Sequence, residues 1–170
     1  MAKKVKPTGA LRFELPFDSQ PPQLTSSAVG LPRVLHRPAS SHVMDVTVLD
    51  DPDGRLLRAG IVIAHRVVDG AGEWYLSAPG WAPHLPQEQS LPMGPNGDLP
   101  EPFARLVKPL ARSAALKPLA TLTVERDEWA LRDSDGEVAA IVRDDKVRVR
   151  RGDDPASRYR EITVLPTELL

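Results

Sequence analysis

Residues 54–67 read GRLLRAGIVIAHRV, and this stretch decides how the rest of the chain is interpreted. The Asp-Gly pair at 53–54 predicts a turn, and the residues after it predict a short helical turn. The apolar run at 61–63 predicts a strand, which continues into His65 and Arg66. A strand that ends in basic side chains either lines an anion-binding cavity or simply reaches solvent. The rest of the sequence has to distinguish these two interpretations.

Length and composition limit the possible functions. The chain has 170 residues, enough for one domain with an apolar core. Its 22 basic and 23 acidic residues give a formal net charge of -1, so overall charge favours neither nucleic acid nor a membrane surface as partner. An anion site must therefore come from local clustering of basic residues. The absence of cysteine excludes disulfides, thiolate catalysis and cysteine-based zinc sites.

The N-terminal sequence MAKKVKPTG is basic, but no apolar segment of a signal peptide follows it. No apolar run approaches the length of about 18 residues that a membrane span needs. We therefore expect a soluble cytoplasmic protein. Residues 1–9 are expected to be a flexible lead-in, and residues 10–170 a single domain.

Short strands and turns account for most of the N-terminal half. Alternating apolar residues predict a strand at 10–15, and Val and Thr enrichment predicts strand structure within 33–49. The turn residues DGAG divide 61–78 into a β-hairpin. Residues 79–102 hold seven prolines, so a long irregular connection is expected there, with one short strand near 87–91.

Residues 103–116, FARLVKPLARSAAL, predict the main helix of the chain. Their apolar residues recur at the three- and four-residue spacing of one helix face. Pro109 lies inside this pattern, and we expect it to kink the helix or to divide it in two, because proline lacks the amide hydrogen that the helix needs.

The C-terminal half predicts more strands. Turn residues are found at Asp133-Ser134-Asp135-Gly136 and at Asp144-Asp145. The strands expected between and after them are 119–132, 137–143, 146–151 and 158–165. The fold class is therefore α+β and mostly β: a closed or nearly closed antiparallel β-barrel or tunnel, which removes strand edges, with one or two packing helices.

Three passages resemble the CYTH, or triphosphate-tunnel, family. They are DDPDGRLLRAGIVIAHR, GEWYLSAP, and WALRDSDGEVAAIVRDDKV followed by YREITVL. Their order and spacing together cover roughly residues 10–165. The resemblance implies a tunnel of antiparallel strands in which basic side chains hold a triphosphate and glutamates hold Mg or Mn.

Many family positions are changed in this chain. The opening Glu-x-Glu-x-Lys of the family falls on Thr8, Ala10 and Arg12, although a shift of one or two residues would bring Glu14 into consideration. Other carboxylates and basic residues of the family are replaced by Ala64, Ser77, Thr123, Ile141 and Thr163.

The resemblance leaves a short set of candidate site residues. The candidate anion-binding residues are Arg12, Arg66, Arg126, Arg143 and Arg160. The candidate metal ligands are Glu88 and Glu161. The alternative for each arginine is a surface charge or a charge at a hairpin end. His65 should point away from Arg66, to the other face of the strand and toward the exterior.

We therefore expect a degenerate CYTH-like domain, a pseudoenzyme that acts as a non-catalytic binding or assembly module and needs no cofactor. Its partner would be another protein or a second copy of the chain, with a polyphosphate or nucleotide as a further ligand. The alternative is a triphosphate- or nucleotide-binding protein, or a weak triphosphatase that depends on Mg or Mn. The basic stripe Lys146, Arg148 and Arg150 has no interleaved aromatics, so it favours protection of a strand edge over nucleic-acid binding.

Overall fold

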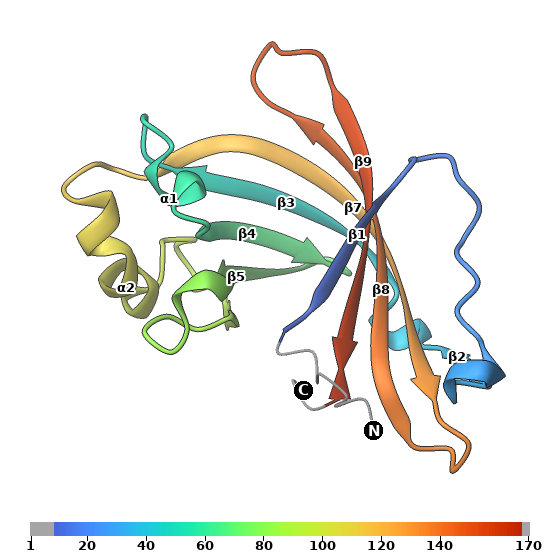
Figure 1. Ribbon diagram of the computed structural model, residues 1–170. Helices are drawn as coiled ribbons and strands as arrows, with labels where there is room; N and C mark the ends of the chain where they lie inside the picture. The colour runs from blue at the N-terminus through green and yellow to red at the C-terminus, as the bar shows by residue number, and fades with distance from the viewer. Residues whose placement is uncertain (1–8, 168–170) are drawn as a thin grey trace. The chain divides into compact units, whose positions relative to one another are not determined.

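The computed structural model describes residues 9–167 (Figure 1). Within it the chain forms two compact units. The first unit comprises residues 9–42, 125–147 and 158–167, and the second comprises residues 43–124 and 148–157. Apart from Gly9, the expected lead-in 1–9 lies outside the described residues, and the expectation of a single domain stays a prediction.

Antiparallel strands make up most of the described chain. In sequence order they are β1 (Leu11–Leu15), β2 (Arg33–His36), β3 (His42–Asp50), β4 (Val62–Val68), β5 (Ala71–Ser77), β6 (Glu88–Pro92), β7 (Lys117–Arg132), β8 (Val138–Arg150) and β9 (Ser157–Pro166). The helices are α1 (Arg55–Arg58) and α2 (Glu101–Ala111), with three short 3-10 turns. This content confirms the predicted mostly β, α+β class.

Hydrogen bonding orders the strands as β1-β9-β8-β7-β3-β4-β5-β6, with β2 also paired to β7. Among residues 9–167 this order is open, with β1 at one end and β6 at the other. The fully closed form of the expected barrel is therefore not found in the described part of the chain.

The second unit is built on the β4–β5 hairpin, which confirms the hairpin expected at 61–78. Ile63 lies directly opposite Leu76 in this hairpin, and both side chains are fully buried. They belong to one apolar cluster with Leu56 of α1 and Phe103 of α2. Figure 1 shows both helices next to the strands of this unit.

Helix α2 presents residues spaced by four to this cluster: Phe103, Val107 and Ala111 are all buried. Pro109 does not divide the helix, so that part of the expectation is wrong. Pro109 lacks one backbone amide, but the buried residues Phe103, Val107 and Ala111 pack against the same apolar cluster on both sides of it and keep the helix continuous. The helix ends at Ala111, and the residue after it, Arg112, has a φ of 57°.

Two aspartates fix the start of α1 in the second unit. Asp50 accepts hydrogen bonds from the backbone amides of Leu56 at 3.0 Å and Leu57 at 3.0 Å. Asp51 accepts from the amides of Asp53 at 2.8 Å and Arg55 at 3.1 Å. Both carboxylates are buried, and both satisfy amides that a helix start leaves without intrahelical partners.

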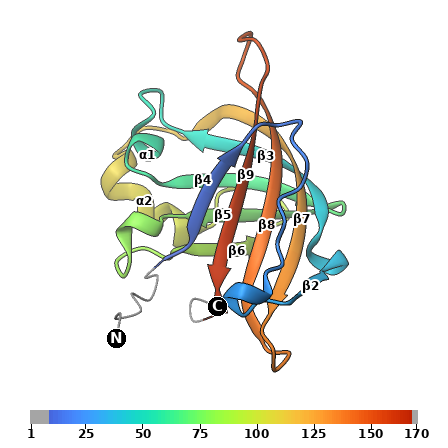
Figure 2. The ribbon, with the colours of Figure 1, turned by 45° about the vertical axis from the view of Figure 1, so that its right-hand side comes forward.

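Strands β1, β9, β8 and β7 lie side by side in the first unit, as Figure 2 shows. Phe13 pairs with Ile162, and Glu14 with Glu161. One face of these strands is apolar. It carries a buried cluster that is also packed by two leucines from the segment between β1 and β2, and its members are Leu131, Ala140, Val142 and Ile162 with Leu15, Leu24, Leu31 and Val164.

Strand β8 runs without interruption from Val138 to Arg150. The predicted turn at Asp144-Asp145 is therefore wrong, and the two strands expected at 137–143 and 146–151 are one. The physical reason is that each aspartate side chain is bonded by an arginine of another strand, Arg160 for Asp144 and Arg126 for Asp145. These ion pairs offset the poor strand propensity of aspartate.

None of the helices in the described part of the chain has the length and apolar character that crossing a bilayer requires.

Candidate functional site: a charged face in the first unit

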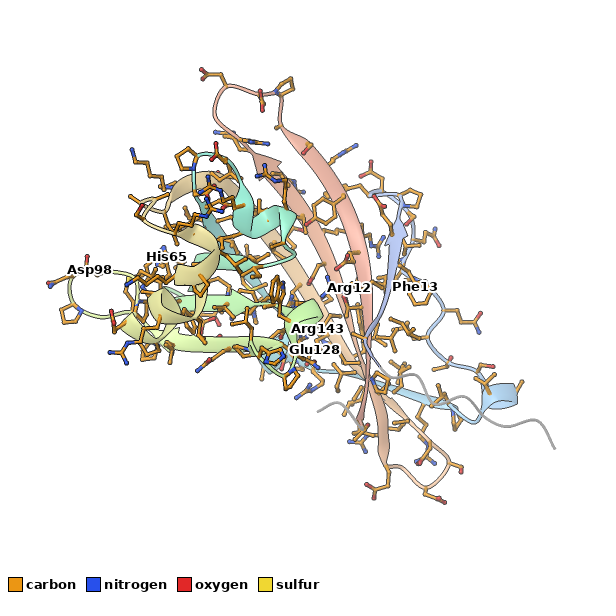
Figure 3. All side chains as sticks on the ribbon, turned by 60° about the vertical axis from the view of Figure 1, so that its left-hand side comes forward. Arg12, Phe13, His65, Asp98, Glu128 and Arg143 are labelled. Atoms are coloured by element: carbon orange, nitrogen blue, oxygen red, sulfur yellow. The ribbon has the colours of Figure 1, made fainter. Side chains whose placement is uncertain are left out.

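A row of charged residues occupies one face of the strands in the first unit. Because side chains alternate along a strand, Arg126 and Glu128 of β7 share a face, as do Arg143 and Asp145 of β8. Arg126 donates from Nε and Nη2 to the two oxygens of Asp145, each at 2.7 Å. Arg143 donates from Nε to Glu128 Oε2 at 3.0 Å, and Figure 3 shows these two residues next to each other. We call these residues, with their neighbours Arg37, Arg12 and Glu161, the charged face.

Glu128 lies at the centre of the charged face, and its side chain is 5% exposed. Its second oxygen, Oε1, accepts from Arg37, which directly follows β2. The backbone fixes this arrangement, since the Arg37 amide donates to the Glu128 carbonyl at 2.8 Å and the Glu128 amide donates to Ser41 Oγ at 2.9 Å. One carboxylate thus joins two arginines from distant segments, Arg143 of β8 and Arg37 after β2.

Sequence reasoning missed both Glu128 and Arg37. The alternation of Glu128 with Arg126 was visible in the predicted strand 119–132, and it could have indicated a shared face. Nothing local connects Glu128 to Arg37, because 91 residues separate them in the chain.

Arg12 and Glu161 form the more open end of the charged face. Arg12 Nη1 lies 3.6 Å from Glu161 Oε1, and the two side chains are 54% and 34% exposed. Thr163 donates from Oγ1 to the same oxygen at 3.4 Å. Glu14 lies directly opposite Glu161 in the β1–β9 register, so the one residue that a shifted alignment would add also faces this side.

Arg160 lies on the opposite, apolar face. Its Nε and Nη2 donate to the two oxygens of Asp144 at 2.8 and 2.6 Å, and its Nη1 donates to the Ser19 carbonyl. The Arg160 and Asp144 side chains are only 1% and 5% exposed. The hydrogen bond with Asp144 raises the pKa of Arg160 although burial opposes this. The structure therefore places this candidate on the other face from the three further candidate arginines of the first unit, Arg12, Arg126 and Arg143.

Arg66, the basic residue of the opening stretch, lies in the second unit. It lies directly opposite Glu73 in the β4–β5 hairpin and donates from Nε to Glu73 Oε1 at 2.8 Å. Its Nη2 donates to Ser90 Oγ at 2.9 Å, and its guanidinium carbon lies 3.9 Å from the centre of the Tyr75 ring. Arg66 is thus held by a carboxylate, a hydroxyl and an aromatic face.

The candidate metal ligand Glu88 belongs to the same group of side chains. Burial raises the pKa of Tyr75, and the negative charge of Glu88 raises it further. Glu88 therefore lies close enough to the phenol to affect its ionisation.

His65 lies away from Arg66, as the alternation predicts, but it shares a face with the fully buried Ile63 and its Nε2 is buried, so the expectation that it points to the exterior is wrong. It pairs with Trp74 across the hairpin, with ring centres 5.9 Å apart, and is half-buried. A Cβ atom at Gly72 would lie 3.3 Å from its Nε2, so glycine leaves room for the ring.

The CYTH resemblance implies a metal site with glutamate ligands, for which Glu88 and Glu161 are the candidates in this chain. Within residues 9–167 no three His, Asp or Glu side chains form a group that could hold a metal ion. Mg²⁺ requires near-octahedral oxygen coordination, and Glu161 instead has the Arg12 guanidinium as a neighbour.

The comparisons with known proteins bear on the fold. No family model matches the sequence, and no curated protein matches it. Among solved structures, a "putative adenylate cyclase" from Bacillus halodurans matches with a TM-score of 0.50 and 15% identity over 77% of this chain and 68% of that chain. A "putative adenylyl cyclase" from Hippeastrum, described as having a dominant triphosphatase activity, matches with a TM-score of 0.47 and 12% identity over 93% of this chain and 79% of its own.

The Bacillus halodurans protein shows that this chain shares its fold with a known structure. The mostly antiparallel architecture of residues 9–167, with two α-helices among them, agrees with the CYTH-like fold expected from the sequence.

Proposed function

We propose that this chain is a non-catalytic binding or assembly module built on a CYTH-like fold. One observation carries the proposal: each of the five candidate anion-binding arginines has a carboxylate partner within the chain. The pairs are Arg12–Glu161, Arg66–Glu73, Arg126–Asp145, Arg143–Glu128 and Arg160–Asp144.

The pairing matters because a triphosphate must compete with these carboxylates. A ligand phosphate that approaches Arg126 meets both oxygens of Asp145 already in the bidentate geometry that guanidinium prefers. Displacing Asp145 would leave a carboxylate, only 14% exposed, without its cation, and removing one partner of a buried pair costs about 3–5 kcal/mol. The ion pairs of the charged face are therefore better suited to stabilising the fold than to binding a polyanion.

A thermal melt tests the proposal directly. Without a site, 1 mM tripolyphosphate or ATP, with or without Mg or Mn, should shift the Tm by less than about 1 °C. A ligand with a Kd near 10 µM would instead add about 2.7 kcal/mol of stability, or roughly 5–10 °C for a chain of this size. Such a shift, or release of phosphate at rates of about 1 per second that are ordinary for enzymes, would establish the triphosphate-binding alternative.

The variant Asp145→Asn provides a matched comparison. It keeps the shape of the side chain but removes the charge that neutralises Arg126. If carboxylate pairing is what prevents binding, this variant should gain a tripolyphosphate-dependent shift that the natural chain lacks. Asp135→Asn, in the exposed turn between β7 and β8, should gain none.

A further inference from the structure

Strand β1 is an exposed edge of the first unit. It pairs with β9 on one side and stands at the end of the strand order in the described chain. Leu11 is 45% and Phe13 52% exposed, unusually open for large apolar side chains in a strand. Native edge strands are normally protected by charge, proline or a covering segment, because their free backbone groups pair readily with another strand.

The five residues of β1 divide cleanly between the two faces of the strand. Leu11, Phe13 and Leu15 lie on the face of the apolar cluster, while Arg12 and Glu14 lie on the charged face. Figure 3 shows the Arg12 and Phe13 side chains on opposite sides of the strand.

We propose that β1 of one copy pairs antiparallel with β1 of a second copy, with Phe13 opposite Phe13. This pairing rests on the assembly role proposed above and gives it a partner, a second copy of this chain. A two-fold axis normal to the sheet relates the copies, so Leu11 faces Leu15 and Arg12 faces Glu14 of the other copy. Each dimer then contains two identical Arg12–Glu14 pairs and a central pair of phenylalanines.

Charge selects this register over its neighbours. Two-fold symmetry allows only registers that differ by two residues, because a paired residue must lie on the same face as its partner. A shift of two in one direction places Arg12 opposite Arg12, and a shift in the other direction places Glu14 opposite Glu14. Like charges directly opposite each other destabilise strand pairs, while opposite charges and aromatic pairs each contribute about 0.2–1 kcal/mol.

Arg12 has the freedom that this contact needs. Its contact with Glu161 is long, at 3.6 Å, and its side chain is 54% exposed. The interface is small because β1 has five residues. Interfaces below about 1,200 Å² belong to weak complexes, so we expect dissociation in the micromolar range.

Sedimentation velocity over a wide concentration range tests the proposal with two single variants. Arg12→Glu creates copies with two glutamates on this face of β1, and Glu14→Arg creates copies with two arginines. Each variant by itself should dimerise at least tenfold more weakly than the natural chain. An equimolar mixture of the two should form a heterodimer, because both contacts between positions 12 and 14 in it join opposite charges.

Controls separate the interface from general effects of charge and folding. Arg151→Glu, in the exposed turn before β9, changes the net charge by the same amount and should leave the dimer unchanged. Phe13→Lys should abolish it. Melting curves of all variants check that the fold is retained.

A chain that stays monomeric up to several hundred micromolar would overturn the inference. So would a dimer that ignores the charge changes, which would use a different surface. These outcomes are independent of the triphosphate test: a strong ligand shift would establish triphosphate binding and leave the β1 dimer standing. A monomer without a ligand shift would overturn the β1 dimer and leave the non-catalytic role standing.

Discussion

At the scale of single residues, the five arginines singled out by the CYTH resemblance differ most in burial. Arg12 is more than half exposed, whereas the Arg160 side chain is 1% exposed and bonded to both oxygens of Asp144. Exposed ion pairs contribute about 0–1 kcal/mol, but removing one partner of a buried pair leaves an uncompensated charge. Arg160 is thus the arginine whose loss should affect folding most.

Arg160→Met should lower the free energy of unfolding by about 3–5 kcal/mol, because Asp144 is left buried without its cation. Urea unfolding at pH 7 measures this. The matched change Arg105→Met, which removes an exposed pair with Glu101 on α2, should cost at most about 0.5 kcal/mol.

A second change checks the cause. Adding Asp144→Leu to Arg160→Met removes the stranded carboxylate and should recover most of the lost stability. A loss below about 1 kcal/mol in the single variant would show that Asp144 finds another partner or water, and would contradict the prediction.

At the scale of elements, Asp50 and Asp51 show how a turn and a helix start are combined. Burial raises the pKa of Asp51, but hydrogen bonds from the amides of Arg55 and Asp53 and the charge of Arg55 outweigh it, so the net shift is downward. The unfolded chain then binds more protons than the folded one in the acid range. The stabilisation from Asp51 is therefore present above its unfolded pKa of about 3.9 and is lost as the pH falls through the lower folded value.

Asp51→Asn should make the urea midpoint less sensitive to pH between about pH 5 and pH 2, since this range spans the ordinary pKa of aspartate and values below it. Asparagine can still accept the two amide hydrogen bonds, so the fold is kept. Asp53→Asn, at a side chain that is 62% exposed, serves as the control and should follow the natural chain. Identical pH profiles for all three proteins would show that Asp51 does not contribute.

The elements that were predicted correctly are those specified by residues close together in the sequence. The hairpin at 61–78 has turn residues and alternating side chains, and α2 has a helical apolar face; both were predicted. The turn at Asp144-Asp145 was wrong because aspartate is a turn residue by local preference. The arginines that hold these two carboxylates in a strand lie 16 and 19 residues away along the chain.

The candidate site was predictable only as a set of residue types. The family pattern pointed to Arg126 and Arg143, but not to the carboxylates that bond them. Partners such as Glu128 come from neighbouring strands, and their identity depends on a register that no short-range signal specifies. The sequence therefore indicated which arginines could bind an anion, but it did not indicate that carboxylates of the same chain already pair with them.

At the scale of the molecule, the chain forms two compact units, yet β7 and β8 each contribute residues to both. A strand that belongs to two units cannot lose its pairing in one without disturbing the backbone of the other. We therefore expect a single cooperative unfolding transition.

Trp129→Phe makes this testable, because it leaves Trp74 and Trp81, both in the second unit, as the fluorescent reporters. Their urea transition should coincide with the one seen by far-ultraviolet circular dichroism, which reports all strands. Two separated midpoints would mean that the units unfold independently.

Asp144 and Asp145, the adjacent aspartates of β8, disfavour incorrect strand registers during folding. Their side chains point to opposite faces, and each meets an arginine of a different strand, Arg126 on β7 and Arg160 on β9. If β8 slipped by one residue, both carboxylates would exchange faces and both arginines would lose their partners together. The Asp144-Asp145 dipeptide, which has the sequence of a turn, therefore stabilises only the native alignment of β8 with β7 and β9. A misaligned sheet would lose one ion pair on each of its two faces.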